Sequence, residues 1–211
     1  SDGDNTICDG EEVIFTASGG TDYEFFVAGS SVQNGPTDHL ITTTLNDGDG
    51  VYAIVTDVNA CSNTTSTINT AVNPVPVAGI ASSDGDNTIC AGESVTFTAS
   101  GTGSNYDFLL NGASDQFGAS NTYATTTLGN GDAVSVIVST VAGCADTSSG
   151  IVTTVNTAPT YTVGLSHPST CGGTDGEIIL QSLIPSTSYD VSYTDDGSGV
   201  GPLSLNSDAA G

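Results

Sequence analysis

The chain has 211 residues, with 24 Asp or Glu, no Lys or Arg, and a formal net charge of −24. Nucleic acids and anionic membrane surfaces attract Lys and Arg, so this composition excludes nucleic-acid binding and argues against membrane association. We also expect no membrane insertion, because no apolar stretch is long enough to span a bilayer. Hydrophobic residues make up 36% of the chain and recur in alternating runs, which indicates packed strands rather than disorder.

An internal repeat organises the chain. Residues 1–8 (SDGDNTIC) return unchanged at 83–90, and residues 10–18 (GEEVIFTAS) return as GESVTFTAS at 92–100. The first pair of equivalent cysteines is 82 residues apart (90 − 8) and the later pair 83 (144 − 61), so one residue is inserted between Ser100 and Tyr106. A period of this length suits a small domain. We therefore predict repeats at 1–74, without its leading strand, and 75–157, followed by a related, truncated domain at 158–211.

Short β-strands are predicted along both repeats. In the first, the strands are expected at residues 13–17, 23–27, 40–45, 51–56 and 65–72, with a short edge strand and loop between 28 and 38. Alternation places Val13, Phe15 and Ala17 on one face and Tyr23, Phe25 and Val27 on another. The second repeat matches at 95–99, 106–110, 123–128, 134–138 and 149–155. Seven or so strands without helical periodicity predict an all-β, immunoglobulin-like sandwich.

The joints between the repeats contain proline. Residues 73–76 (NPVP) and 157–159 (TAP) are expected to form short, stiff linkers, giving a head-to-tail rod. After Thr160 the sequence changes, but residues 171–178 (CGGTDGEI) keep the order of cysteine, turn and strand. We interpret this last part as a third sandwich that is cut after about half its strands.

Several motifs carry a family resemblance. The pattern Ile-Cys-x-Gly-Glu-x-Val-x-Phe-Thr-Ala-Ser, an aromatic strand, Leu-x-x-Gly-Asp-x-Val and a late cysteine resemble the PKD-like and Ig-like tandem repeats of large Bacteroidetes surface proteins. The segment at 171–178 resembles the repeat of gliding-motility adhesins from the same phylum. The resemblance implies export, commonly by type IX secretion, a cell-surface location, and a role as an adhesive filament or stalk. Its partners would be neighbouring repeats and an unidentified surface or glycan target. The alternative function is a non-catalytic module array of a secreted polysaccharide-degrading enzyme.

Five cysteines lie at positions 8, 61, 90, 144 and 171. Their equivalent spacing predicts one disulfide per repeat, Cys8 with Cys61 and Cys90 with Cys144, in an oxidising extracellular compartment, and leaves Cys171 unpaired. Strict Ig topology conflicts with this pairing, because it places the two cysteines of a repeat at opposite poles, about 17–20 Å apart, too far for a disulfide. We expect the in-repeat pairing, with a bond between neighbouring repeats, such as Cys8 to Cys144, as the alternative.

Acidic residues are predicted to converge at one pole of each repeat. In an Ig sandwich the segment before the second strand and the turn before the sixth lie at the same pole, because these strands run in the same direction. Oxygen ligands of this kind suit Ca²⁺, which could stiffen the joint to the next domain. The alternative is that these residues only form solvated turns. The candidate ligands are Asp2, Asp4, Asn5, Asp47 and Asp49 in the first repeat, and Asp84, Asp86, Asn87 and Asp132 in the second.

Catalytic patterns are weak in this sequence. Only His39 and His167 could act as bases near neutral pH, and the second repeat has Thr122 in place of His39. The sequence shows no serine nucleophile elbow, zinc-binding histidine pair or phosphate-binding loop. We therefore interpret both histidines as surface residues and predict that the segment is not an enzyme.

Overall fold

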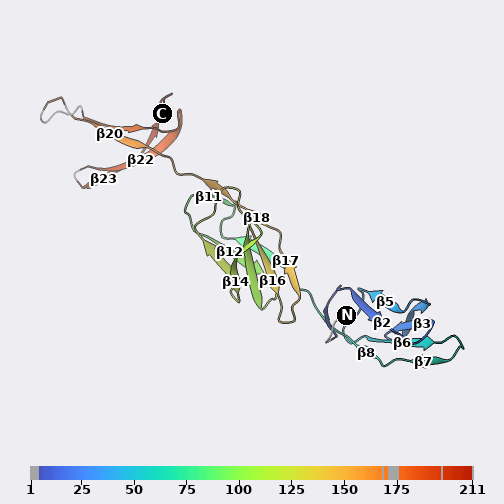
Figure 1. The fold of residues 1–211 in the computed structure, drawn as a ribbon. Coiled ribbons are helices and arrows are strands. Elements are labelled where there is room, and N and C mark those ends of the chain that lie inside the picture. Colours follow the sequence, from blue (N-terminus) through green and yellow to red (C-terminus); the bar gives the residue numbers. More distant parts are fainter. Residues whose placement is uncertain (1–4, 168, 171–175, 196, 211) are drawn as a thin grey trace. The chain divides into compact units, whose positions relative to one another are not determined.

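The computed structural model describes residues 5–167, 169–170, 176–195 and 197–210. By contacts along the chain it divides into two compact units, Ser1–Val155 and Asn156–Gly211. Strands, turns and bends make up the regular structure of both units over these residues (Figure 1). Among the described residues there is no helix long and apolar enough to cross a membrane.

The second repeat is a two-sheet sandwich. One sheet has the strand order β10-β12-β15, and the other has the order β14-β13-β16-β17, with β18 also pairing with β16. The pairs within these two sheets are antiparallel, and the short strand β11 pairs with β19 in a separate two-stranded sheet. This order is that of an Ig-like sandwich whose third strand carries an extra edge strand. The strands are β10 (Gly79–Ser82), β11 (Thr88–Cys90), β12 (Val95–Ser100), β13 (Asn105–Leu110), β14 (Ala113–Gly118), β15 (Thr122–Thr125), β16 (Ala133–Ser139), β17 (Ala145–Thr147), β18 (Ile151–Val152) and β19 (Thr154–Asn156).

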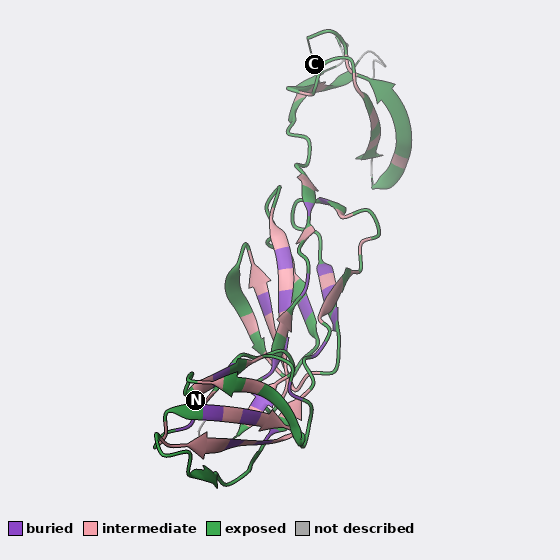
Figure 2. Ribbon diagram, turned by 90° about the vertical axis from the view of Figure 1, so that its right-hand side faces the viewer, coloured by how far each residue is buried: buried purple, intermediate pink, exposed green. Residues whose placement is uncertain are grey.

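The core of the second repeat lies between these sheets. Phe97 of β12 and Phe108 of β13 are fully buried, and both rings stack on Tyr123 of β15, at centroid distances of 6.2 and 5.6 Å. Alternate residues of β16 complete the core, so buried positions alternate with partly exposed ones along this strand (Figure 2). The alternation predicted from the sequence is confirmed at Phe97 and Phe108, and packing of this kind is what drives two sheets together.

The first repeat has the same two sheets with one strand fewer. Strand β2 pairs with β5, and a second sheet has the order β4-β3-β6-β7, with β8 on β6, while β1 pairs in parallel with β9. Among the described residues no strand takes the place that β10 has beside β12. Phe15 is consequently only half-buried, whereas its counterpart Phe97 is fully buried. The strands are β1 (Thr6–Cys8), β2 (Val13–Thr16), β3 (Asp22–Val27), β4 (Ser30–Gly35), β5 (His39–Thr42), β6 (Gly50–Thr56), β7 (Ser62–Thr64), β8 (Ile68–Asn69) and β9 (Ala71–Asn73).

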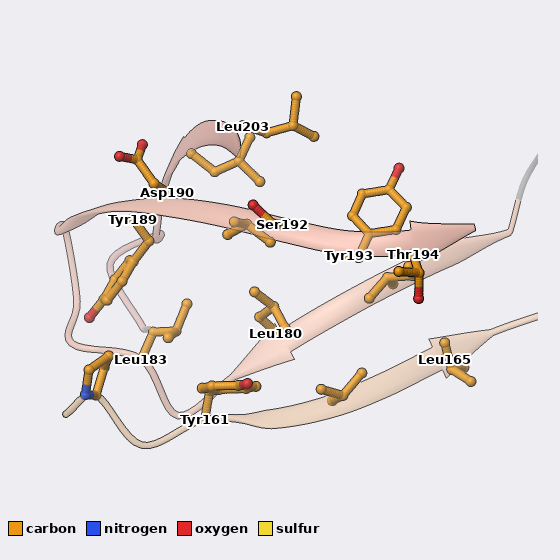
Figure 3. Close-up of a pocket in the computed structure, with 15 residues that line it drawn as sticks. Tyr161, Leu165, Leu180, Leu183, Tyr189, Asp190, Ser192, Tyr193, Thr194 and Leu203 are labelled. Carbon is orange, nitrogen blue, oxygen red and sulfur yellow. The ribbon is translucent and has the colours of Figure 1, made fainter. Parts of the chain in front are cut away.

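The second unit consists of two antiparallel hairpins. Strand β20 (Thr162–Ser166) pairs with β21 (Glu177–Gln181), and β22 (Ser188–Asp195) pairs with β23 (Ser198–Asn206). Apolar side chains of both hairpins, among them Tyr161, Leu180, Leu183 and Tyr189, line an open hollow of about 550 Å³ (Figure 3). The apolar faces of these hairpins are accessible to solvent, since Val163, Leu165 and Ile178 are exposed. A third, truncated sandwich at 158–211 stays a prediction.

Candidate functional site

The site that distinguishes this chain is a disulfide between its two repeats. Cys8 of the first repeat is bonded to Cys144 of the second, with a Cα–Cα distance of 5.5 Å and a sequence separation of 136. Cys61 and Cys90 are free and exposed. The predicted in-repeat pairings, Cys8 with Cys61 and Cys90 with Cys144, are therefore wrong, and the alternative between neighbouring repeats is confirmed. The prediction that Cys171 is unpaired concerns a position outside the described residues.

The geometry of a single repeat explains why the in-repeat bond does not form. Cys8 ends strand β1 and lies opposite Asn73 in the β1–β9 pair, at the pole where β6 begins. Cys61 follows the other end of β6, in the turn before β7. Strand β6 has seven residues, and at about 3.3 Å per residue it separates the two cysteines by roughly 20 Å. A disulfide requires Cα atoms less than about 7 Å apart.

A short turn holds each early cysteine, and we call residues 8–11 and 90–93 the early-cysteine turns. The Cys8 amide donates to Glu11 Oε2 at 3.0 Å, and the Glu11 amide donates back to the Cys8 carbonyl at 3.0 Å. Gly10 adopts φ +80°, which favours glycine at this position. The Ile-Cys-x-Gly-Glu motif is thus one structural device, in which a buried isoleucine anchors the strand and the glutamate closes the turn.

The second early-cysteine turn has the same hydrogen bonds. The Cys90 amide donates to Glu93 Oε2 at 3.0 Å, and the Glu93 amide donates to the Cys90 carbonyl at 3.0 Å. Gly92 has φ +83°, and Ile89 is buried. Neither glutamate was predicted to have a role, although a glutamate recurs three residues after each early cysteine in the sequence.

The late cysteines lie in matching turns, residues 57–61 and 140–144, which we call the late-cysteine turns. The Thr140 amide donates to the Cys144 carbonyl at 2.9 Å, and the Asp57 amide donates to the Cys61 carbonyl at 3.0 Å. In the first repeat the Asp57 carboxylate also accepts the amides of Cys61 and Asn59, at 2.9 and 2.8 Å. These backbone hydrogen bonds hold the pKa of Asp57 below its ordinary value.

The linker, by which we mean residues 73–78 at the end of β9 and before β10, covers the late-cysteine turn of the second repeat. The Ala78 amide donates to Asp146 Oδ2 at 2.9 Å, and the Asn73 carbonyl oxygen lies 3.8 Å from Cys144 Sγ. The Val77 carbonyl lies so close to Gly101 that a Cβ there would clash with it. Cys144 is 1% exposed as a result. The joint is therefore a disulfide beside a packed linker, and no pattern in the sequence predicted the linker contacts.

The acidic residues of the first repeat act as hydrogen-bond acceptors in turns. Asp2 and Asp4 lie outside the described residues. Asp47 Oδ1 accepts the Val72 amide at 3.0 Å, and Asp49 Oδ2 accepts the Asn46 amide at 2.8 Å. Asn5 has φ +58°, in the left-handed region that Asn tolerates in turns.

The acidic residues of the second repeat have corresponding bonds. Asp84 and Asp86 converge on one donor, the Thr88 amide, at 3.0 and 2.9 Å. Asn130 accepts the Val155 amide at 3.0 Å, which is the bond that Asp47 makes in the first repeat. The Asp-to-Asn difference between the repeats is explained by this bond, since it requires only an oxygen acceptor. Asn87 has φ +56°, like Asn5.

Asp132 accepts a hydrogen bond at each of its two carboxylate oxygens. Asn111 Nδ2 donates to Asp132 Oδ1 at 2.8 Å, and the Gly129 amide donates to Oδ2 at 2.7 Å. The Asn111 bond and then the Gly129 bond lower the pKa of Asp132. Over the described ranges, no group of three or more His, Cys, Asp or Glu residues is placed to hold a metal ion. Calcium binding at these poles stays a prediction.

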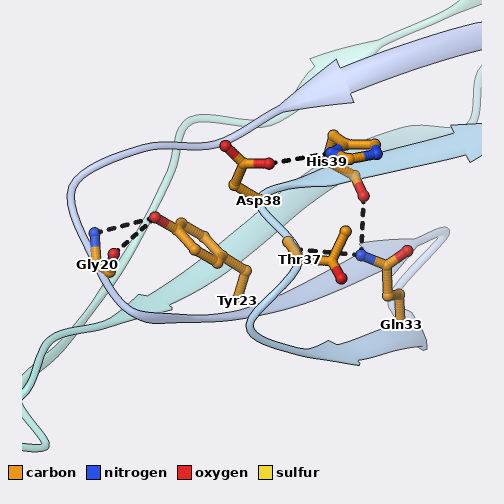
Figure 4. A network of polar contacts seen from close by, with 6 residues as sticks. All are labelled: Gly20, Tyr23, Gln33, Thr37, Asp38 and His39. Carbon is orange, nitrogen blue, oxygen red and sulfur yellow. Dashed lines mark hydrogen bonds and ion pairs between the residues drawn. The ribbon is translucent and has the colours of Figure 1, made fainter.

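His39 belongs to a polar network at the β4–β5 connection (Figure 4). Its Nδ1 lies 3.0 Å from Asp38 Oδ1, both side chains are exposed, and Gln33 Nε2 donates to the His39 carbonyl at 2.9 Å. In the second repeat Gln116 donates to the Thr122 carbonyl at 2.8 Å without any histidine. The hairpin bond is therefore independent of the imidazole.

A tyrosine near the start of β3, and its counterpart in β13, each anchor the loop that precedes the strand. Tyr23 Oη donates to the Gly20 carbonyl at 2.7 Å (Figure 4), and Tyr106 Oη makes the longer bond of 3.4 Å to Gly103. Within the described part of the chain, no hydrogen bond joins the ring of His39 to a serine, threonine or cysteine, and His167 is exposed.

No protein-family model matches the chain, and no curated protein matches it. Among solved structures, it is similar to fibronectin(III)-like modules of Clostridium thermocellum CbhA, with a TM-score of 0.40 and 16% identity over 71% of this chain and 89% of that chain. It is also similar to a marsupial T cell receptor, with a TM-score of 0.43 and 13% identity over 92% and 88%. Similarity at this level does not indicate a function. The Ig-like fold is defined by the strand order within each repeat.

Proposed function

We propose that the chain is a structural and adhesive segment of an extracellular bacterial surface filament or giant adhesin, in which Ig-like repeats form a stalk. The observation that carries this proposal is the Cys8–Cys144 disulfide. Disulfides of this kind persist in oxidising, extracytoplasmic environments. The motif resemblance to Bacteroidetes surface adhesins supports the same location.

The placement of the bond suits a mechanical role. Two Ig-like domains joined only by a linker reorient freely unless their interface is large. Here the linker and the disulfide connect the same two repeats, and the linker is bonded to the second repeat through Ala78 and Asp146. A second covalent connection at the joint restricts bending and twisting between the repeats. That property is useful in a stalk that holds a binding region away from the cell.

The acidic composition fits the same role. With 24 carboxylates and no Lys or Arg, neighbouring stalks repel one another, which keeps an exposed filament soluble and separate from its neighbours. The absence of Lys and Arg also removes every cleavage site for trypsin-like proteases. Both properties favour survival outside the cell.

Immunogold electron microscopy of intact, unpermeabilised cells with antibodies against this chain tests the proposal. Label along regular surface fibres is the expected result. Label confined to the culture supernatant, in a fraction that carries polysaccharide-degrading activity, would overturn it in favour of an accessory array of a secreted enzyme.

A further inference from the structure

The chain contains two further cysteines in the same two kinds of turn as the bonded pair. Cys8 and Cys90 occupy early-cysteine turns, and Cys61 and Cys144 occupy late-cysteine turns. The bond that forms joins the early turn of one repeat to the late turn of the next repeat along the chain. This leaves Cys61, a late cysteine, and Cys90, an early one, free and exposed.

We propose that Cys61 and Cys90 form the same kind of early-to-late disulfide with other copies of the repeat. Cys61 would bond to the early-cysteine turn of a preceding repeat of this kind, and Cys90 to the late-cysteine turn of a following one. The partner in each case is another copy of the repeat. The inference rests on the proposed function only in requiring an extracellular, oxidising location.

The early-cysteine side is preformed. Cys90 has the same two 3.0 Å hydrogen bonds to Glu93 that Cys8 has to Glu11. Its strand β11 pairs with β19, and these two strands are the counterparts of β1 and β9 in the first repeat. Cys90 is thus held by the same local structure that presents Cys8 to its partner, and no rearrangement of its turn is needed.

The late-cysteine side shows what its partner must cover. In the second repeat Val138, Cys144 and Ser148 are buried, with exposed fractions of 0%, 1% and 7%, and the Asn73 carbonyl lies beside Cys144. Their counterparts in the first repeat are Val55, which is partly exposed, and Cys61 and Thr65, which are exposed. A hollow of about 420 Å³ opens at this place, and its lining includes Gly19, Val55, Asp57, Cys61 and Asn63.

The occupant that fits this hollow is the end of another repeat with its linker. Residues 73–78 fill the equivalent place in the second repeat, where Ala78 bonds to Asp146 and the Val77 carbonyl approaches Gly101. Asn63 stands at the position of Asp146. Its side-chain oxygen accepts the Thr64 amide at 2.9 Å and has a second lone pair that can accept a linker amide. The hollow therefore corresponds in position and chemistry to the place that the linker fills beside the Cys8–Cys144 bond.

The polarity of the joint determines what would assemble. An early turn pairs with a late turn, so the two surfaces are different and the contact is heterologous. Such a contact does not close on itself as a symmetric dimer does, and it continues as an open, head-to-tail chain. Each additional repeat then brings one further disulfide.

The bond requires an oxidant. Two cysteine thiols lose two protons and two electrons to form one disulfide, and a low-molecular-weight disulfide such as oxidised glutathione takes them up and becomes two thiols. The exchange proceeds through a mixed disulfide, attacked by the second thiolate. Exposure of both Cys61 and Cys90 permits this attack.

The test uses two variants of the full chain, both carrying Cys171→Ser so that this thiol does not take part. One also carries Cys61→Ser and the other Cys90→Ser, and one of the two is labelled with nitrogen-15 so that their dimers differ in mass. They are mixed in equal amounts in a glutathione redox buffer and analysed by non-reducing mass spectrometry. Cleavage before aspartate residues places Cys61 and Cys90 in separate peptides, which identifies the bonded pair.

We expect mixed Cys61–Cys90 dimers to dominate, whereas random pairing would give about half mixed dimers. The chain with Cys171→Ser alone should form a ladder of multimers under the same conditions. Like-with-like dimers at the random proportion, or no bond between chains although Cys8–Cys144 forms, would overturn the inference. Surface labelling by immunogold is independent of this result, so the two proposals can fail separately.

Discussion

Removing the Cys8–Cys144 bond should uncouple the unfolding of the two repeats. The perturbation is the double variant Cys8→Ser/Cys144→Ser, which leaves no new unpaired thiol. A disulfide lowers the entropy of the unfolded chain by an amount that increases with the number of residues in the closed loop. In this chain the size of that loop depends on which repeat has unfolded.

The magnitude follows from three loops. When the first repeat alone unfolds, the bond closes a loop from Cys8 to the linker at Ala78, 70 residues (78 − 8), and stabilises that repeat by about 4.4 kcal/mol. When the second alone unfolds, the loop from Asn73 to Cys144 has 71 residues (144 − 73), and the effect is again about 4.4 kcal/mol. When both unfold, the loop follows the sequence separation of 136, and the total is about 5 kcal/mol.

These values make unfolding cooperative. Whichever repeat unfolds first must overcome nearly the whole stabilisation by the bond. The repeat that is still folded is then stabilised by only about 0.6 kcal/mol. With the disulfide present, the two repeats should therefore melt together. Without it, each should melt on its own and at a lower temperature.

Hydrogen exchange followed by mass spectrometry resolves the two repeats. The slowest amides of β6 and β16 should exchange about 10³-fold faster in the double variant, as expected for a loss of about 4.4 kcal/mol. The matched control is Cys61→Ser/Cys90→Ser, which should leave exchange unchanged because both residues are free and exposed. Unchanged exchange in Cys8→Ser/Cys144→Ser would refute the coupling.

Gly101→Ala should destabilise the chain more than Gly19→Ala, measured by urea unfolding. Both glycines have positive φ, where alanine is strained at a cost of about 1–3 kcal/mol, but only at Gly101 does the new Cβ meet the Val77 carbonyl; equal losses would contradict the linker contact. In acid, Asp132→Asn should make the melting temperature less sensitive to pH below 3.8. The folded pKa of Asp132 lies below that ordinary value, so its stabilisation is complete above pH 3.8 and is lost as the pH falls through the lowered pKa; an unchanged slope would count against this. Calcium binding at the acidic poles should raise the melting temperature in millimolar Ca²⁺, and Asp86→Asn should reduce the rise; no shift in the parent chain would end that hypothesis.

Much of the fold could be predicted because alternation reports which residues are buried. The strand expected at 51–56 is β6 (Gly50–Thr56), and the strand expected at 23–27 is β3 (Asp22–Val27). The run at 40–45 was less accurate, since β5 ends at Thr42 and Leu45 enters the core from beyond the sheet. A threonine-rich run has high β-propensity throughout, so propensity does not show where pairing ends.

The last strand of the first repeat was expected to be continuous and is interrupted. Thr70 separates β8 (Ile68–Asn69) from β9 (Ala71–Asn73), and its side chain is buried and donates to the Asp49 carbonyl at 3.1 Å. At this residue the chain leaves β6 and pairs with β1 instead. The change of partner depends on a long-range contact that strand propensity does not encode.

The disulfide pairing could not be predicted from the spacing of the cysteines alone. The intervals from Cys8 to Cys61 and from Cys90 to Cys144 are consistent with bonds within repeats, but the bond skips to the next repeat. Spacing measures distance along the chain, whereas pairing depends on which pole each cysteine occupies. Ig topology already contained that information, because it places early and late cysteines at opposite poles.

The position of the bond changes what a disulfide contributes to an array of repeats. A bond inside each repeat would stabilise that repeat alone and leave the linker as the sole connection to the next. A bond from an early to a late cysteine stabilises two neighbours at once, because unfolding of either opens a loop of about 70 residues. It also resists reorientation at the joint, since the bond acts beside a linker that is already seated on Asp146. In an array built this way, every internal repeat takes part in two such joints, so its stability comes from both neighbours and is least at a repeat that lacks one of them.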